Sequence, residues 1–274
     1  GIDYLTLHWR QHPFKDEEWY EFQKQRRTDE EVAQEIDISY HRSQTGRVYP
    51  EWDNVEYGFY PYEDNLPTYV AWDFGRTDDN PLIWFQAPPS EKVRITDAYT
   101  NHGKTIDFYV PFVTGVVPGM DYHYSKKDLD IIESHKNWKR ATHFGDPAGK
   151  SRHGEADKSV LEVLKTYGIY VNALDEYKYF EKRRNATKLL LRELVVNENI
   201  RTKELGAAIE SAHYPMITRG GMEDPRTIKP IDDWTSHYRT ALEYFAVGYQ
   251  KLSGRRGEVR DKFPPKPRKR IIAY

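Results

Sequence analysis

The chain contains no cysteine. A disulfide framework and a thiolate metal site are therefore both excluded, and the composition fits a reducing compartment. No apolar run approaches the roughly 20 residues that a membrane-spanning helix needs, so we expect no membrane partner. The net charge is only -2, and this total does not by itself indicate a nucleic-acid-binding protein.

Aromatic and charged residues are plentiful instead. The 7 Trp, 21 Tyr and 11 Phe supply core side chains, while 31% charged and 38% hydrophobic residues indicate a globular protein. A chain of 274 residues is long enough for one large domain or for a domain with an appendage.

Two parts of the chain differ from the rest. Residues 1–66 are polar and contain a short acidic-ended helix near Asp16, a capping box from Thr28 to Glu31, and a linker or hairpin over 53–67. We interpret this part as an appendage. Residues 254–274 form a basic tail kept extended by prolines, which either binds phosphates or an acidic partner or serves as a solubilising segment.

Residues 67–253 show a regular order of elements. Strands are predicted over 68–73, 80–87, 93–99, 141–146 and 169–173, and helices over 104–116, 125–136, 155–167, 179–194, 205–211 and 234–252. The first three strands have short connections and predict an antiparallel meander. A meander followed by strand–helix units predicts an α/β fold, with a mixed sheet and helices on both faces.

Acidic residues stand at the ends of two predicted strands and at the start of the last helix. Asp73 ends the run Thr68–Trp72, Asp146 follows Gly145, and Asp233 precedes His237. A carboxylate at the end of a buried strand is costly unless a positive charge compensates it. Taken one at a time, each aspartate is as well explained as a turn or cap residue. Together they predict a divalent-metal site.

The ligand types indicate which ion that would be. Carboxylate oxygens suit Mg²⁺ or Mn²⁺, whereas zinc more often recruits His or Cys. Two such ions can activate a water and stabilise the leaving oxygen in phosphodiester cleavage. His237 is either a ligand, a general acid–base group or a structural histidine.

The sequence resembles the nuclease domain of the large terminase subunit of tailed phages. The matching pieces are Leu7–Trp9, Ala33–Glu35, Ala71–Gly75, Ile95–Tyr99, Phe144–Gly149, Arg184–Ala186, Asp233–His237 and Phe245–Gly248. The resemblance implies a ribonuclease H-like fold. It also implies that residues 1–66 are the end of an ATPase domain and its linker, that 67–253 are the nuclease domain, and that 254–274 are the tail. The chain has no Gly-x-x-x-x-Gly-Lys-Ser/Thr loop, so no complete ATPase site is expected.

One position departs from the family pattern. The family places a metal-binding aspartate three residues after the histidine of the last helix, where this chain has Thr240. Asp233 or Asp232 is a candidate third carboxylate, with Thr240 and Asp79 as possible outer ligands. The alternative is a weakened second metal site.

Basic residues near the acidic ones are candidates for DNA contact. Lys150, Arg152 and His153 follow Asp146, where a phosphate would lie, or else belong to a solvated loop. For the basic side chains of residues 178–188 we favour a solvated helix face.

The leading hypothesis, implied by the resemblance, is a metal-dependent endonuclease that cuts concatemeric double-stranded phage DNA during genome packaging. Its expected partners are the DNA, the portal protein and the small terminase subunit, in the host cytoplasm at the procapsid portal. The alternatives are a weakly active portal-docking or DNA-binding module and another ribonuclease H-like nuclease of the resolvase or transposase type.

Overall fold

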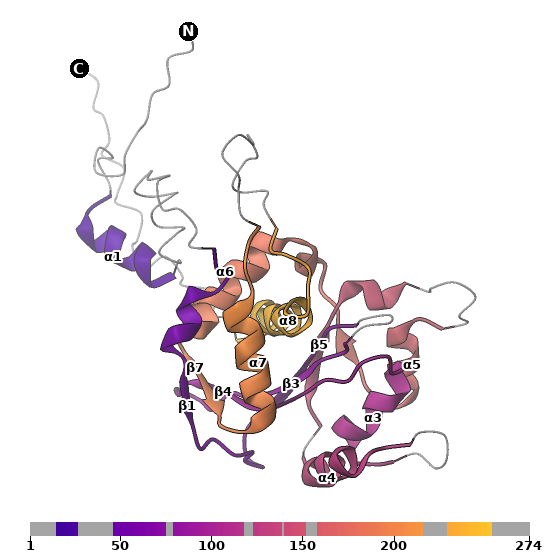
Figure 1. The fold of residues 1–274 in the computed structure, drawn as a ribbon. Helices are drawn as coiled ribbons and strands as arrows, with labels where there is room; N and C mark the ends of the chain where they lie inside the picture. The colour runs from indigo at the N-terminus through magenta and orange to yellow at the C-terminus, as the bar shows by residue number, and fades with distance from the viewer. Residues whose placement is uncertain are drawn as a thin grey trace, which may run out of the picture.

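A seven-stranded mixed sheet forms the centre of the protein (Figure 1). The computed structural model describes residues 15–26, 46–74, 79–117, 123–138, 140–151, 158–215 and 229–253. In spatial order the strands are β1-β7-β4-β3-β2-β5-β6. They are β1 Glu56–Gly58, β2 Thr68–Trp72, β3 Leu82–Gln86, β4 Val93–Tyr99, β5 Thr142–Gly145, β6 Val171–Asn172 and β7 Leu194–Asn197.

The pairing of the strands confirms the predicted mixed sheet. Strands β2, β3 and β4 form the antiparallel meander, and β5 runs parallel to β2. Strand β6 is parallel to β5, β7 is parallel to β4, and β1 is parallel to β7.

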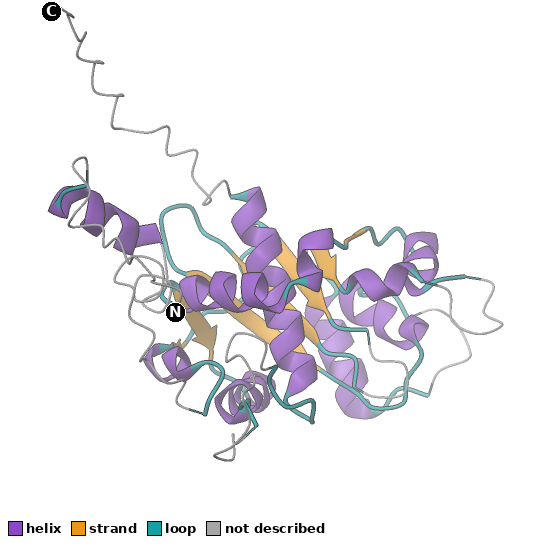
Figure 2. Ribbon diagram, turned by 90° about the horizontal axis from the view of Figure 1, so that it is seen from above, coloured by secondary structure: helices purple, strands orange, loops and turns teal. Residues whose placement is uncertain are grey.

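Helices cover both faces of this sheet (Figure 2). The α-helices are α1 Glu17–Arg26, α3 Ile106–Thr114, α4 Lys126–His135, α5 Val160–Thr166, α6 Phe180–Leu191, α7 Ile200–Ser211 and α8 Ser236–Leu252. Helices α6, α7 and α8 pack over one face, and α3, α4 and α5 over the other. Helix α1 stands apart from the sheet (Figure 1). Among the described residues, no helix is long and apolar enough to cross a bilayer.

Alternation along β2 decides which layer its last residue faces. Val70 and Trp72 belong to the core under α3, α4 and α5, while Ala71 belongs to the core under α8. Side chains of a strand alternate between the two faces, so Asp73, the next residue, lies on the α8 face. The polar end of the strand is therefore directed toward the last helix.

One predicted helix was too long. The sequence pattern over 179–194 favoured a single helix, but α6 ends at Leu191 and Leu194 begins β7. A short apolar run such as Leu194–Val196 cannot be assigned to helix or strand by periodicity alone. Pairing with β4 and β1 makes it a strand. Helix α7 likewise begins at Ile200, capped by Asn199, rather than at residue 205.

Part of the region that we assigned to an appendage packs into the core. Tyr49 and Trp52 are fully buried, and β1 extends the sheet beyond β7. Residues 46–58 therefore share the core with residues that follow position 66. The predicted capping box at Thr28 and the basic tail lie outside the described residues, and the division into domains stays a prediction.

Candidate active site

Asp73 and Asp146 lie next to each other at one edge of the sheet. Strands β2 and β5 are parallel neighbours, and Trp72 pairs with Gly145. The two aspartates are the residues that directly follow this pair. The structure thus brings the ends of these two strands together.

Phe74 joins these two strand ends. A Cβ atom on Gly145 would lie 2.9 Å from the Phe74 ring, and one on Gly149 would lie 2.8 Å from it. Both positions require glycine because a side chain there would collide with the ring. The two glycines around Asp146 and the phenylalanine after Asp73 therefore form one packing unit that holds the carboxylates together.

His237 is the direct partner of Asp73. Its Nδ1 lies 3.1 Å from Oδ2 of Asp73, and the two side chains are 23% and 13% exposed. Helix α8, which carries His237, packs on both β2 and β5. The contact orients the Asp73 carboxylate while leaving the pair partly open to solvent.

The electrostatic setting of Asp73 is unfavourable for a negative charge. Burial raises the pKa of its carboxyl, the hydrogen bond from His237 lowers it, and the charge of Asp146 raises it further, so that the pKa is raised overall. Opposed carboxylates of this kind are stabilised by a cation between them. The donor set therefore fits a hard divalent cation.

Asp146 also has a local structural role. Its Oδ1 accepts a hydrogen bond of 2.8 Å from the Ala148 backbone and so caps a short 3-10 helix, Pro147–Lys150. Asp146 is therefore a cap residue, as one of the two interpretations of this aspartate predicted. A cap does not exclude a ligand role, because a carboxylate can accept several contacts.

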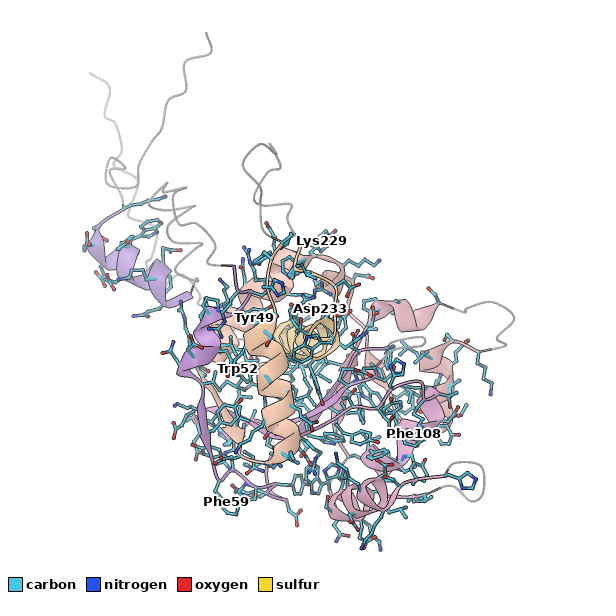
Figure 3. The ribbon with its side chains drawn as sticks, in the orientation of Figure 1. Tyr49, Trp52, Phe59, Phe108, Lys229 and Asp233 are labelled. Atoms are coloured by element: carbon cyan, nitrogen blue, oxygen red, sulfur yellow. The ribbon has the colours of Figure 1, made fainter. Side chains whose placement is uncertain are left out.

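Asp233 is hydrogen-bonded within its own turn. Its Oδ1 accepts hydrogen bonds from the backbone and hydroxyl of Thr235, at 2.9 and 2.6 Å, in the turn that begins α8 (Figure 3). Burial raises its pKa, but the Thr235 hydrogen bonds lower it more. Asp232 is exposed, and Thr240 lies half-buried one turn beyond His237. Within the described residues, no three acidic or imidazole groups are placed to hold a metal ion together.

The remaining predicted residues lie around this edge or outside the described ranges. Asp79 pairs with His102, with 3.3 Å between Oδ1 and Nδ1. Lys150 is exposed at the end of the turn that Asp146 caps. Arg152 and His153 lie outside the described residues.

The basic side chains of residues 178–188 form the solvated face that we favoured only in part. Lys178 and Lys182 are exposed. Arg184 and Lys188 are buried, and Arg183 forms an ion pair with Glu243, which is fully buried on α8. Sequence reasoning overlooked Glu243. A single glutamate among the apolar residues of the Ala241–Val247 run is the signal that could have identified it.

A second buried cluster is centred on Asp97 of β4. His135 Nε2 lies 2.9 Å from Oδ2 of Asp97, and Arg201 Nε donates to Oδ1 at 2.8 Å. Burial raises the pKa of Asp97, but these partners lower it more, so the pKa is lowered overall. Asp97 is thus an ionised structural carboxylate that joins β4 to α4 and α7.

Asp97 is expected to make the fold sensitive to acid. Because its pKa is lowered by folding, its contribution is complete above the unfolded value of about 3.9 and is lost as pH falls through the folded value. Asp97→Asn should reduce the free energy of unfolding at pH 7 by about 1.5–3 kcal/mol. It should also flatten the loss of stability below pH ~4. Urea unfolding at several pH values measures both effects.

The matched control for this substitution is Asp130→Asn, on the exposed side of α4. It should leave the pH dependence of unfolding as in the wild type. Equal acid slopes for Asp97→Asn and wild type would contradict the assignment.

No protein-family model and no curated protein matches the chain, whereas several solved structures do. The large terminase from a thermophilic bacteriophage, in complex with ADP, is 16% identical, with a TM-score of 0.61 over 88% of this chain and 54% of that chain. The same protein with ATP-gamma-S gives 16% identity and a TM-score of 0.61, over 88% and 55% of the two chains. The large terminase nuclease from thermophilic phage G20c with bound zinc is 13% identical, with a TM-score of 0.45 over 74% and 98%.

The chain spans about half the length of the ADP-bound large terminase. At 16% identity the likeness is one of fold. The predicted α/β class, a mixed sheet with helices on both faces, is confirmed. Over 88% of its length, this chain has a fold found in a phage large terminase.

Proposed function

We propose that this chain is a metal-dependent endonuclease that hydrolyses DNA phosphodiester bonds. One observation carries the proposal: Asp73 and Asp146 end adjacent parallel strands on the same edge, and Asp73 is held by His237. In this reaction a water molecule is the nucleophile, so no side-chain nucleophile is needed at the ends of these strands.

The residues divide the task between them. Asp73 and Asp146 would hold Mg²⁺ or Mn²⁺, whose oxygen preference matches the two carboxylates. When bound, such an ion supplies an activated water and stabilises the leaving oxygen. His237 keeps the Asp73 carboxylate in a fixed orientation, which is the usual role of a hydrogen-bonding partner behind a ligand. Lys150, exposed beside Asp146, is placed to attract a DNA phosphate.

The two-ion arrangement predicted from the sequence is part of this proposal. Asp233 is occupied with Thr235, so phosphate oxygens of the DNA and water would complete the coordination. Thr240 offers a hydroxyl where the family pattern has a carboxylate, and this substitution would weaken the binding of the second metal ion.

A role in genome packaging is proposed from the fold. The likeness to a large terminase supports concatemeric double-stranded phage DNA as substrate, with the portal protein and the small terminase subunit as partners. This role would place the chain in the host cytoplasm, at the procapsid portal.

Removal of divalent cations tests the proposal directly. The purified chain should nick or linearise supercoiled plasmid in Mn²⁺ or Mg²⁺, and excess EDTA should lower the rate at least about 100-fold, because the ion supplies several kcal/mol of transition-state stabilisation. Agarose gels that follow the loss of supercoiled plasmid measure the rate. Re-addition of Mn²⁺ should restore it. Cleavage that persists in EDTA would refute the metal-dependent mechanism.

A further inference from the structure

Gly248 occupies the second half of α8, where the backbone does not need a glycine. The helix runs without a break from Ser236 to Leu252, and Gly248 does not adopt a positive φ. A glycine inside a helix is less favourable than an alanine, because it loses more backbone freedom on folding. Gly248 is also buried. The reason for a glycine at this position must therefore lie in what packs against the helix.

Two buried aromatic side chains fill the space beside Gly248. A Cβ atom on Gly248 would collide with the ring of Phe144 and would lie 2.6 Å from the hydroxyl of Tyr177. Both side chains are only 1% exposed. The Phe144 ring is also flanked by the rings of Tyr69 and Phe245, at centroid distances of 6.2 and 6.0 Å, so it has little room to move. An added methyl group would therefore displace α8 by about 1 Å, up to ordinary van der Waals contact.

The contact between Gly248 and Phe144 is linked to both halves of the candidate site. Phe144 belongs to the core under α8, and Asp146 follows two residues later, on the same side of the sheet. His237 precedes Gly248 by three helical turns, so both lie on the face of α8 that packs on β2 and β5. A helix that moves away from Phe144 carries His237 with it. The 3.1 Å contact from His237 Nδ1 to Oδ2 of Asp73 tolerates little of such a shift.

We propose that Gly248 is a positioning residue for DNA hydrolysis: its missing side chain lets α8 rest on Phe144 at the depth where His237 reaches Asp73. The inference rests on the proposed function, because it assumes that a fixed orientation of the Asp73 carboxylate matters for the reaction. It assigns a role in the reaction to a residue about 16 Å from His237 along the helix. The rate of cutting then depends on how closely α8 packs on β5.

Gly248→Ala tests this inference through the kinetics of plasmid cleavage in Mn²⁺. The substitution should lower kcat about tenfold or more, because a misplacement of about 1 Å can cost ~100-fold, while KM for DNA stays within about twofold of wild type. In a His237→Ala background the same substitution should change kcat less than about twofold, since the contact that it disturbs is already absent. If the two effects simply multiply, Gly248 does not act through His237 and the inference is overturned.

The matched control is Gly206→Ala, in helix α7. Gly206 is also buried, and a Cβ atom there would collide with the hydroxyl of Tyr57. The control therefore introduces the same kind of strain on the same side of the sheet, away from His237. Thermal unfolding followed by circular dichroism should show both variants folded and less stable than wild type, but Gly206→Ala should keep kcat within about twofold. An equal loss of kcat in both variants would assign the effect to general strain and overturn the inference.

Two further measurements keep the inference open to refutation. If Gly248→Ala does not fold, Phe144→Leu alters the other side of the same contact; it should lower kcat at least about threefold with KM unchanged, and a wild-type kcat would overturn the inference. A crystal structure of Gly248→Ala needs no cleavage at all. A separation of His237 and Asp73 beyond about 3.5 Å supports the inference, and one that stays near 3.1 Å overturns it, even if the wild type proves inactive and the proposed function fails.

Discussion

Asp73→Asn is expected to lower the rate of plasmid cleavage by about 10²–10⁴-fold, since it removes a proposed ligand of an ion that would supply several kcal/mol of transition-state stabilisation. Asparagine has nearly the same volume and can still accept a hydrogen bond from His237. The substitution therefore removes charge while leaving the edge of the sheet packed. Loss of supercoiled plasmid over time in Mn²⁺ measures the rate.

Two measurements make this result specific. Asp79→Asn changes another aspartate close to the same edge, but one that pairs with His102, and it should retain activity within a few-fold of wild type. Thermal unfolding of Asp73→Asn should show a folded protein, because neutralising a carboxylate whose pKa is raised by folding does not destabilise it. A wild-type rate in Asp73→Asn would remove Asp73 from the mechanism.

Glu243→Ala is expected to lower the free energy of unfolding by about 3–5 kcal/mol, the usual cost of leaving buried charges without their partner. The substitution removes the hydrogen-bond acceptor of Arg239 and of the Tyr49 hydroxyl, and it removes the ion-pair partner of Arg183. It also cuts the polar link between helix α8 and the segment before β1. Urea denaturation at pH 7 measures the change.

Glu181→Ala is the matched control on helix α6. Glu181 is exposed, and surface substitutions away from special features usually change stability by no more than about 0.5 kcal/mol. If Glu243→Ala destabilises the protein no more than Glu181→Ala, the buried network does not hold α6 and α8 together.

Local sequence patterns were sufficient for much of the fold. β4 has the predicted bounds of 93–99, β2 is one residue shorter than predicted at one end, and β5 is one residue shorter at each end. These strands are short runs of branched and aromatic residues between clear turn signals, so period and composition define them without help from the rest of the chain. The meander followed from the order of elements.

The patterns failed where partners distant in the sequence decide the structure. β7 was missed: the predicted helix ended at Leu194, and residues 195–197 were assigned to no element. Its apolar run Leu194–Val196 suits either state, and its neighbours β1 and β4 lie about 100 or more positions away along the chain. β1 lies in the polar stretch 53–67, which was interpreted as a linker or hairpin, and its neighbour β7 is also distant along the chain. Glu243 was overlooked because its partner Tyr49 lies 194 positions away.

The candidate site shows the same division. The presence of aspartates at two strand ends is a property of short segments, and parallel pairing brings Asp73 and Asp146 together in any fold of this order. The direction of the last helix is not determined by any short segment. It places His237 against Asp73, while Asp233 remains in its own turn. Which side chain reaches the edge depends on the packing of α8 against β2 and β5. That packing is a sum of many contacts between distant segments, and no short stretch of sequence contains it.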